Sequence, residues 1–309
     1  MKLDKLGMIL NIEDVGLDWA VTHAEAPFLD LTYDKSGESN LYFGTRNKNN
    51  KSQICRVRMK FKMLNKWELL YTYDEPMLRL GDLGYFDDSA VKTPWIVHIP
   101  GHRSFMYYTG WMEGKNVLYH PSIGLASYNP DIKAFVRSSL APIIHRSSIS
   151  PIGHHCPCVI YDGMFYRMFY SSLTAWENMD GEKRSYYCIG QSRSTDGRIW
   201  DMFQYSIIHG ADNFARPCII YEDGKYKMWY SYSKYDEHRY RIGYAESVDR
   251  GITWETQHDK IEFDVGPSGS FDSDMMAYPY IFNYQGIKYM LYNGNDFGKK
   301  GIGYGIIYD

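Results

Sequence analysis

The sequence predicts an all-β protein, a five-bladed β-propeller with four-stranded antiparallel blades. One phrase recurs along the 309 residues, and a proline marks the start of every copy. A repeat this regular indicates small supersecondary units, each of which must stack on its neighbours to bury its hydrophobic face. The prolines, spaced 67, 63, 60 and 62 residues apart, are Pro27, Pro94, Pro157, Pro217 and Pro279.

The clearest copy of the phrase runs from Arg216 to Trp254 and shows why each unit should be a small sheet. Its segments 218–221, 226–230 and 240–247 are rich in aromatic and β-branched residues, and 226–230 alternates as a half-buried strand does. Glycine-containing turns separate these runs, and a fourth strand begins near the tryptophan. Four short strands in each of five units are typical of a propeller.

The blades follow one another along the chain, and residues 1–22 precede the first. We expect residues 8–13 to form a strand that pairs with the end of the chain, because propellers often join their two ends and so avoid a free sheet edge. The fifth unit stops before its fourth strand, which fits this exchange. The predicted blades of this single domain are 23–80, 81–145, 146–208, 209–265 and 266–309.

Two connections are longer than the others. Residues 112–121 join two strands of the second blade, and residues 174–184 form an insertion in the third. Long loops are common places for ligand contacts. The insertion carries Trp176, whereas Trp111 ends the strand before the first connection. Each tryptophan is expected either to stack on a sugar face or to pack in the core.

Composition argues against several kinds of partner. The net charge of −3 gives no bulk field for nucleic acid or a membrane surface, and no run approaches the roughly 18 apolar residues of a membrane span. Five cysteines, an odd number spread over the chain, do not suggest a disulfide framework. The N-terminal segment lacks the apolar stretch of a signal peptide. We therefore expect a cytoplasmic protein in a reducing compartment.

The polar residues just before each proline are expected to meet at one mouth. In a propeller the innermost strands line the central axis, so their equivalent ends converge although they are far apart in sequence. Four blades then bring carboxylates or imidazoles to the mouth, and the remaining blade brings a guanidinium. The candidates for acid, base, nucleophile or proton donor are Glu25, Asp88, His155 and Asp274, and those for substrate binding are His23, Asp87, Trp111, His154, Arg216, Asp272, Tyr278 and Asn293.

This set of residue types suggests sugar chemistry on a charged ligand. Carboxylates that face each other across a sugar-sized gap can cleave a glycoside, because one protonates the leaving oxygen while the other attacks or activates water. The same mouth gathers potential cations, including Lys92, and arginine suits a bidentate grip on phosphate or carboxylate. We expect a carbohydrate or sugar-nucleotide ligand with negative charge. Solvated loop ends are the alternative for any single residue.

The cluster of His154, His155, Cys156 and Cys158 allows two interpretations. His and Cys are typical zinc ligands. However, Cys158 and Cys218 occupy the same position after the repeated proline, and Cys218 has no histidine neighbours. Small buried cysteines in strands explain both. We expect no metal site, and no cofactor is indicated, since the chain lacks a glycine-rich phosphate loop followed by a helix.

The five units and their polar residues before proline resemble the five-bladed glycosidase propellers: arabinanases and xylosidases, invertases and levansucrases, and mannoside phosphorylases. In the invertase-like families the first three blades carry an Asp-Pro nucleophile, an Arg-Asp-Pro and a Glu-Cys-Pro acid. Here only the Cys-Pro at Cys156 matches outright. Ala26 follows Glu25 at the first position, Thr93 occupies the second, and His155 stands where the acid would be.

The phrases DSDMMAYP, NYQGIKYMLYNGN and GKKGIGYG also resemble a group of small glycosidase-like propellers that accompany bacterial surface-polysaccharide synthesis. The resemblance implies an enzyme of bacterial glycan metabolism that cleaves or transfers a glycosyl group. The departures from the usual acids leave a second function open, a non-catalytic glycan-binding propeller derived from a glycosidase. A structural scaffold for partner enzymes is a third alternative.

Overall fold

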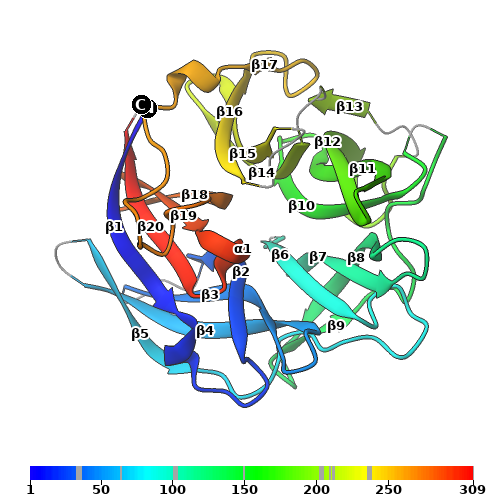
Figure 1. Cartoon of the computed structure of the whole chain (residues 1–309), viewed down its shortest axis with the longest axis horizontal. Coiled ribbons are helices and arrows are strands. Elements are labelled where there is room, and N and C mark those ends of the chain that lie inside the picture. The colour runs from blue at the N-terminus through cyan, green and yellow to red at the C-terminus, as the bar shows by residue number, and fades with distance from the viewer. Residues whose placement is uncertain are drawn as a thin grey trace.

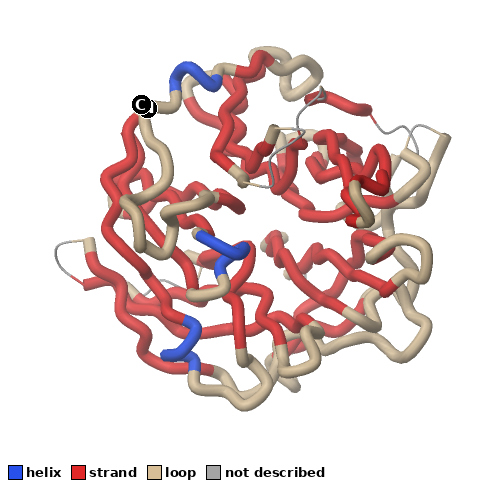
Figure 2. Tube along the Cα trace, in the orientation of Figure 1, coloured by secondary structure: helices blue, strands red, loops and turns tan. Residues whose placement is uncertain are grey.

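The protein is nearly all-β, as the computed structural model in Figure 2 shows. The structure describes residues 1–32, 37–62, 65–99, 104–148, 150–201, 205–208, 210, 213–234 and 239–308. Within these ranges no helix is both long and apolar enough to cross a membrane. The sheets surround a central axis (Figure 1). The helical segments are single turns, η1 (Ile12–Val15), η2 (His258–Lys260) and α1 (Asn295–Gly298).

The first half of the chain forms one eight-stranded sheet. Its two halves are joined by a single parallel residue pair, Ser52 with Ala90, and the other pairings described in it are antiparallel. Each half therefore resembles one repeat unit. The strands in order are β2 (Thr22–Asp30), β3 (Glu38–Arg46), β4 (Ser52–Lys62), β6 (Ala90–Val97), β7 (Phe105–Glu113), β8 (Tyr119–Asn129) and β9 (Ala134–Arg137), with β5 (Lys66–Thr72) paired to β4.

Two four-stranded antiparallel sheets follow. Residues 174–184, predicted as an insertion loop, extend the hairpin of the third unit through paired residues up to Met179 and Glu182. The first sheet contains β10 (Gly153–Tyr161), β11 (Tyr166–Met179), β12 (Glu182–Ser194) and β13 (Tyr205–Ile208). The second contains β14 (Asn213–Glu222), β15 (Lys225–Ser233), β16 (Arg241–Ser247) and β17 (Glu255–Thr256).

The fourth sheet brings the two ends of the chain together. It contains β18 (Ala277–Tyr284), β19 (Ile287–Asn293), β20 (Gly301–Tyr308) and β1 (Lys2–Asn11). β1 pairs antiparallel with β20 from Lys2 opposite Tyr308 to Asn11 opposite Gly301. This strand was predicted at residues 8–13, but it begins earlier and ends at Asn11, where the Asn11 side chain caps η1.

Each innermost strand contains a β-bulge at its proline. The residue before the proline has a φ between 50° and 56°, and the register with the second strand shifts at the same point. The proline disfavours the right-handed helical region for that residue. Because the bulge recurs, residues at the same offset from each proline occupy equivalent places. The bulge residues are Ala26, Thr93, Cys156, Arg216 and Tyr278, on β2, β6, β10, β14 and β18.

Hydrogen bonds between neighbouring units hold four of these bulges. In each, the backbone N–H of the bulge residue donates to a side-chain oxygen on the second strand of the neighbouring unit. The pairs, with N···O distances of 2.7–3.0 Å, are Ala26 with Asn293, Cys156 with Thr109, Arg216 with Ser171 and Tyr278 with Ser231. The position that would serve Thr93 is Gly44, where a Cβ would lie 2.9 Å from the Cβ of Lys92. Glycine there makes room for Lys92.

The residues directly after the prolines fill the axis. The rings of Phe28, Trp95 and Tyr280 contact one another, with centroids 5.0–5.7 Å apart. Cys158 and Cys218 occupy the remaining two places, and both are buried free thiols. The prediction that these two cysteines are small buried strand residues is confirmed. The axis is therefore packed on this side of the bulges.

Candidate functional site

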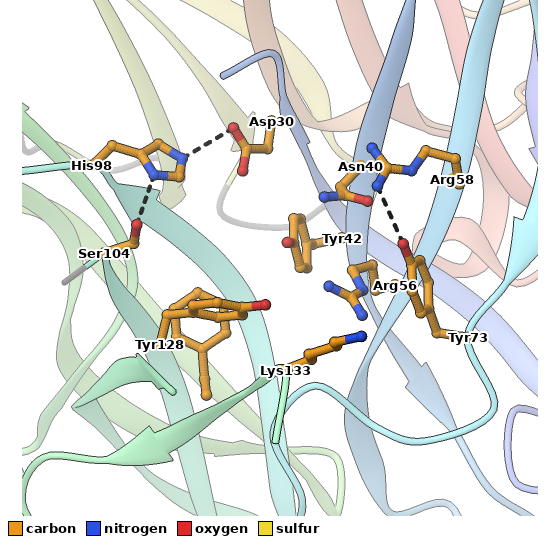
Figure 3. Close-up of a pocket in the computed structure, with 11 residues that line it drawn as sticks. Asp30, Asn40, Tyr42, Arg56, Arg58, Tyr73, His98, Ser104, Tyr128 and Lys133 are labelled. Carbon is orange, nitrogen blue, oxygen red and sulfur yellow. Dashed lines mark hydrogen bonds and ion pairs between the residues drawn. The ribbon is translucent and has the colours of Figure 1, made fainter. Parts of the chain in front are cut away.

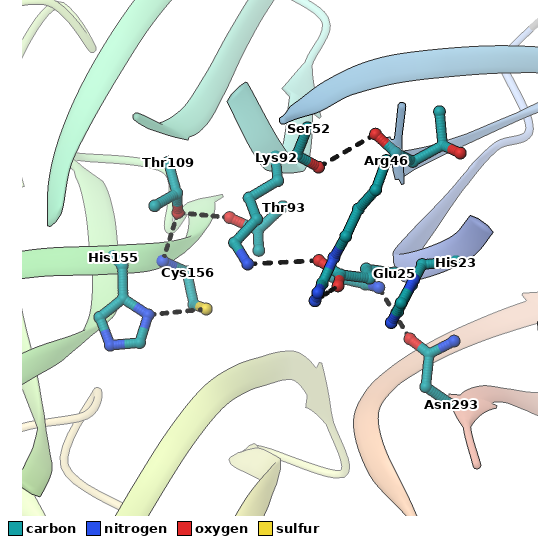
Figure 4. A network of polar contacts seen from close by, with 12 residues as sticks. His23, Glu25, Arg46, Ser52, Lys92, Thr93, Thr109, His155, Cys156 and Asn293 are labelled. Atoms are coloured by element: carbon teal, nitrogen blue, oxygen red, sulfur yellow. Dashed lines mark hydrogen bonds and ion pairs between the residues drawn. The ribbon is translucent and has the colours of Figure 1, made fainter. Parts of the chain in front are cut away.

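A buried carboxylate held by two cations lies beside the bulges (Figure 4). Glu25 on β2 is 1% exposed and accepts hydrogen bonds from Arg46 and from Lys92, whose Nζ is 3.2 Å from Oε2. Burial alone would raise the pKa of Glu25, but the charges of Lys92 and Arg46 outweigh it and lower the pKa. Glu25 is therefore ionised at neutral pH.

The repeated bulge explains why these groups meet. Glu25, Lys92 and His155 each lie one residue before the bulge residue in their own units. The same offset therefore brings a carboxylate, an ammonium and an imidazole together from β2, β6 and β10. In the other two units this place holds Ala215 and Ala277, which are buried and contribute no polar group.

Lys92 is enclosed between Glu25 and an aromatic pair. Its Nζ lies 3.5 Å from the ring centre of Trp111. The Tyr119 ring is parallel to Trp111 at 3.9 Å, so both faces of the indole are covered. Burial lowers the pKa of Lys92, and the charge of Glu25 partly offsets this effect. Trp111 therefore lies at the site. The sequence left open whether it stacks on a sugar or packs in the protein, and its covered faces favour packing.

His155 completes this cluster through two tyrosines. Its ring lies 4.9 Å from that of Tyr187, and the Tyr187 hydroxyl is 2.6 Å from the Tyr119 hydroxyl. Nδ1 lies 3.2 Å from the sulfur of Cys156, and Nε2 has no hydrogen-bond partner among the described residues. Burial, followed by the charge of Lys92, lowers the pKa of His155 to about 3. The imidazole is therefore neutral at pH 7, which argues against a charged proton donor.

A cavity of about 270 Å³ opens at this cluster. Glu25 lies behind Arg46 and Lys92, which line the wall. The only other carboxylate among the described lining residues is the exposed Glu113 at the rim. The cluster therefore sets two cations, the buried Lys92 and the partly exposed Arg46, against one buried carboxylate. The lining residues are Arg46, Asn50, Ser52, Ser89, Ala90, Lys92, Trp111, Glu113, Leu118 and Tyr119.

Two predicted ligand-binding residues flank the carboxylate. His23 lies next to Glu25 (Figure 4), and its Nδ1 is 2.9 Å from the hydroxyl of Thr22. Burial lowers the pKa of His23 to about 4 despite the nearby Glu25, so this imidazole is also neutral at pH 7. Burial raises the pKa of Tyr278, and the charge of Glu25 adds to the shift. The structure thus brings both residues to the same charge cluster.

Asp87 and Asp272 are structural carboxylates in equivalent places of two units. Asp87 accepts from Tyr108 at 2.9 Å and from Arg137 at 2.8 Å. Asp272 accepts from Tyr292 at 3.1 Å and from Lys5 at 2.7 Å. Both are buried, at 0% and 2% exposure. Each carboxylate therefore anchors a loop to its sheet, and the predicted role of both in substrate binding stays a prediction.

The other two predicted acids are also engaged away from Glu25. Asp88 closes a turn by accepting from the N–H of Gly84 at 2.9 Å and from the hydroxyl of Ser89 at 2.7 Å. The Asp274 side chain is 63% exposed, and its nearest cation is Arg239 at 3.8 Å. These contacts place Asp88 in its own turn and Asp274 at the surface. The catalytic roles of Glu25, Asp88 and Asp274 stay a prediction.

Three further candidates serve the fold. Arg216 is fully buried and donates to the carbonyls of Ala26 at 3.4 Å and Pro27 at 3.0 Å, so it ties β14 to β2 instead of facing the mouth. Asn293 bonds the backbone of β2 and β20 with both ends of its amide. His154 is buried and packs edge-on against Tyr170 at 5.1 Å. All three side chains are buried in these contacts, while Nε and Nη1 of Arg216 have no hydrogen-bond partner among the described residues. Their predicted role in substrate binding stays a prediction.

Sequence reasoning missed Arg46, Glu113 and Tyr119. Arg46 ends the second strand of the first unit, and Glu113 and Tyr119 flank the long connection 112–121. That connection was expected to contact ligands, but no residue of it was chosen as a candidate. A search for charged residues at the mouth ends of the second strands, and not only before the prolines, would have found Arg46.

Known structures with this fold are glycoside hydrolase propellers. A structure named glycoside hydrolase superposes with a TM-score of 0.74 at 18% identity, covering 99% of this chain and 91% of that one. The RGII complex of BT0996 gives a TM-score of 0.73 at 17% identity with the same coverage. Endo-arabinase from Bacteroides thetaiotaomicron gives 0.65 at 15%, covering 95% and 97%. At such identities the likeness shows the fold alone. The chain therefore shares the fold of these structures.

Two curated sequences define its family more narrowly. They are the Mycobacterium tuberculosis proteins named uncharacterized protein MT1551 and uncharacterized protein Rv1502. Each is 33% identical over 297 residues, which cover 94% of this chain and 94% of the relative. The chain belongs to the family of these two proteins. No model in a scan of known protein families matches it.

Proposed function

We propose that this protein is a carbohydrate-active enzyme that cleaves or transfers a glycosyl group of an anionic sugar. The observation that carries the proposal is the cluster of the partly exposed Arg46 and the buried Lys92 around the buried carboxylate of Glu25. A sugar phosphate, nucleotide-sugar or sugar acid that enters the adjoining cavity brings the negative charge that these two cations can hold. The glycosidase-like fold supports a sugar as the remainder of the ligand.

The charge states at the site favour one kind of leaving group. Glu25 is ionised, so it acts as base or nucleophile, and neither neutral imidazole supplies a strongly acidic proton. A leaving group that departs as a stable anion needs no such proton. In the proposed transfer the anomeric C–O bond breaks, phosphate leaves with the electron pair, and Arg46 and Lys92 hold it. Once the phosphate has drawn Arg46 and Lys92 away from Glu25, the freed carboxylate takes the proton of the acceptor hydroxyl, and the acceptor oxygen forms the new bond to the anomeric carbon.

The architecture proposed for this function is one domain with five blades. It counts the two halves of the eight-stranded sheet as separate blades, because a single residue pair joins them, and it treats the pairing of β1 with β20 as the closure. The resemblance of three sequence phrases to propellers of surface-polysaccharide synthesis supports a role in bacterial glycan metabolism. A cytoplasmic location belongs to the same proposal.

A non-catalytic glycan-binding protein is the second candidate. It is favoured by the burial of Glu25, which is 1% exposed, and by the structural roles of Asp87 and Asp272. Ordinary glycoside hydrolysis uses two carboxyl groups that face the substrate. For the enzyme, the anion of the ligand must first compete with Glu25 for the two cations.

A turnover assay separates the two candidates. The protein is incubated with glycosyl phosphates and nucleotide-sugars, with water or a sugar as acceptor, and released phosphate or nucleotide is measured. The enzyme proposal predicts release that Glu25→Gln lowers at least 100-fold, while Glu68→Gln, which alters an exposed ion pair, leaves it unchanged. Ligand binding without any turnover would support the glycan-binding candidate.

A further inference from the structure

A second cavity lies at the opposite end of the strands that form the first. It has a volume of about 320 Å³ and lies between the two halves of the eight-stranded sheet (Figure 3). β3 contributes Arg46 to the first cavity and Asn40 to the second. These two residues are six positions apart on the strand. At ~3.3 Å per residue the two cavities are separated by roughly 20 Å. A ligand in one cavity therefore does not contact the other.

A buried arginine without an acidic partner lines this second cavity. Arg56 is 7% exposed, its guanidinium carbon lies 3.5 Å from the ring centre of Tyr73, and its Nε has no hydrogen-bond partner among the described residues. Arg58 donates to the hydroxyl of the same Tyr73 at 3.3 Å. Within the described ranges no carboxylate lies within 4.0 Å of either guanidinium. Burying a cation in this way is unfavourable unless an anion accompanies it.

The carboxylate that the cavity does contain is already engaged. Asp30 accepts from the N–H of Thr32 at 3.0 Å and lies 3.0 Å from Nε2 of His98. The other ring nitrogen of His98 is 2.8 Å from the Ser104 hydroxyl. These contacts hold Asp30 on the wall across from the arginines (Figure 3). Asp30 therefore does not neutralise Arg56 or Arg58.

A polar acceptor and an aromatic wall accompany the cations. Asn40 is 3% exposed, and its Oδ1 has no hydrogen-bond partner in the described part of the chain. Tyr128 and Phe135 pack edge to face at 5.4 Å and line the cavity together with the exposed Lys133. The cavity thus offers three cations to an anion, one acceptor to a hydroxyl group and an apolar surface.

We propose that this second cavity binds a sugar phosphate. Arg56 and Arg58, held in place by Tyr73, grip the phosphate, and Lys133 approaches it from the rim. Oδ1 of Asn40 accepts a hydrogen bond from a sugar hydroxyl. This site is separate from the Glu25 cavity, and its occupation does not depend on the function proposed there.

Calorimetric titration with inorganic phosphate and with glucose 6-phosphate tests this proposal. The titrations use the Lys92→Met variant, in which a principal cation of the first cavity is removed. Binding of both ligands is expected to persist, with glucose 6-phosphate binding more tightly. Arg58 is partly exposed and Lys133 is exposed, so both can be replaced with little effect on folding. The combined Arg58→Gln and Lys133→Gln variant is expected to bind both ligands at least 10-fold more weakly. Asn40→Leu is expected to remove the advantage of glucose 6-phosphate over phosphate.

The control is Arg79→Gln, which removes an exposed arginine outside the cavity and should leave the titrations unchanged. Arg56→Met removes the central cation and is expected to abolish phosphate binding. If this buried substitution prevents folding, the Arg58 and Lys133 variants still test the proposal. Phosphate binding that is lost in Lys92→Met, or that is unchanged in the combined Arg58→Gln and Lys133→Gln variant, would overturn the proposal. Equal affinity for phosphate and glucose 6-phosphate would overturn the contact with a sugar.

Discussion

Lys92 donates to Glu25 over 3.2 Å, and these two residues occupy the same place relative to the proline in neighbouring repeat units. The pair is buried on both sides, with side-chain exposures of 8% and 1%. Glycine at position 44 leaves the space that Lys92 fills. The charge pair thus depends on the repeat, because two charged residues occupy equivalent positions and one glycine leaves room for Lys92.

Breaking this pair from one side should be costly. Lys92→Met leaves Glu25 with Arg46 alone, and we expect the free energy of unfolding to fall by about 3 kcal/mol, because a buried charge loses a partner. Glu25→Gln should cost a similar amount. Urea unfolding of both single variants and the double variant measures the coupling, which we expect to exceed about 1 kcal/mol.

The exposed pair of Lys62 and Glu68, at 2.9 Å, is the matched comparison. Lys62→Met and Glu68→Gln should each change stability by less than about 1 kcal/mol. Additive effects of Lys92→Met and Glu25→Gln, with no coupling, would show that the two side chains do not interact in solution.

Each hydrogen bond between neighbouring units should make its own contribution to the free energy of unfolding. Ser231→Ala leaves the bulge N–H of Tyr278 without its acceptor, and we expect a loss of about 1–2 kcal/mol. Ser171→Ala should act in the same way on Arg216. Ser39→Ala is the control, because its buried hydroxyl has no partner among the described residues, and it should be neutral or stabilising. Equal effects in all three variants would contradict the role of these bonds.

Stability should fall as the solution becomes acidic below pH 6.5. The pKa values of His23 and His155 are lowered from 6.5 to about 4 and about 3, chiefly by burial. Between those values and pH 6.5 the unfolded chain binds protons that the folded chain does not, so the free energy of unfolding decreases with falling pH. Each group contributes up to about 1.4 kcal/mol per pH unit.

His155→Gln isolates one of these contributions. Urea unfolding between pH 4 and 7 should show a shallower pH dependence for this variant than for the wild type. As the pH rises above 6.5 the unfolded imidazoles also lose their protons, so the two slopes should converge toward neutral pH. A variant slope as steep as that of the wild type at pH 5 would contradict the burial of His155 as a neutral ring.

The two aspartates of the loop before β18 should differ sharply. Asp272→Asn removes a buried charge from Lys5, and we expect it to lower the free energy of unfolding by about 3 kcal/mol. Asp274→Asn alters an exposed side chain and should stay within about 0.5 kcal/mol. Thermal or urea unfolding of the two variants decides this point. The reverse order would contradict the structural role of Asp272.

Much of the fold could be predicted because the sequence repeats. The prolines, the glycine turns and the alternating aromatic residues predicted the strands, and residues 8–11 do pair with the end of the chain. The meeting of polar residues such as Glu25 and His155 at one mouth was predicted from the same spacing. The extension of β11 and β12 was not, because a polar segment with an Asp-Gly turn resembles a loop when only its composition is considered.

The site was harder to predict because adjacent residues in a strand point to opposite sides. His154 and His155 are neighbours, yet only His155 contacts the tyrosines of the charge cluster. Asp87 and Asp88 likewise serve different contacts. Arg216 lies on the bulge itself, where a long side chain reaches across the axis to the carbonyls of β2. Spacing places a residue in a unit, but side-chain direction and burial decide its role.

Ligand-induced thermal stabilisation tests the central claim most directly. The ligands are sugar phosphates, nucleotide-sugars, sugar acids and neutral oligosaccharides. They are compared on three proteins that all carry Arg58→Gln, which weakens binding at the second cavity: this variant alone, and the same variant with Lys92→Met or with Arg216→Met added. We predict that anionic sugars raise the Tm much more with the Glu25 site intact or with Arg216→Met than with Lys92→Met, because Lys92 lines the cavity and Arg216 does not. Stabilisation by neutral oligosaccharides alone, unchanged by Lys92→Met, would contradict an anionic ligand at the Glu25 site.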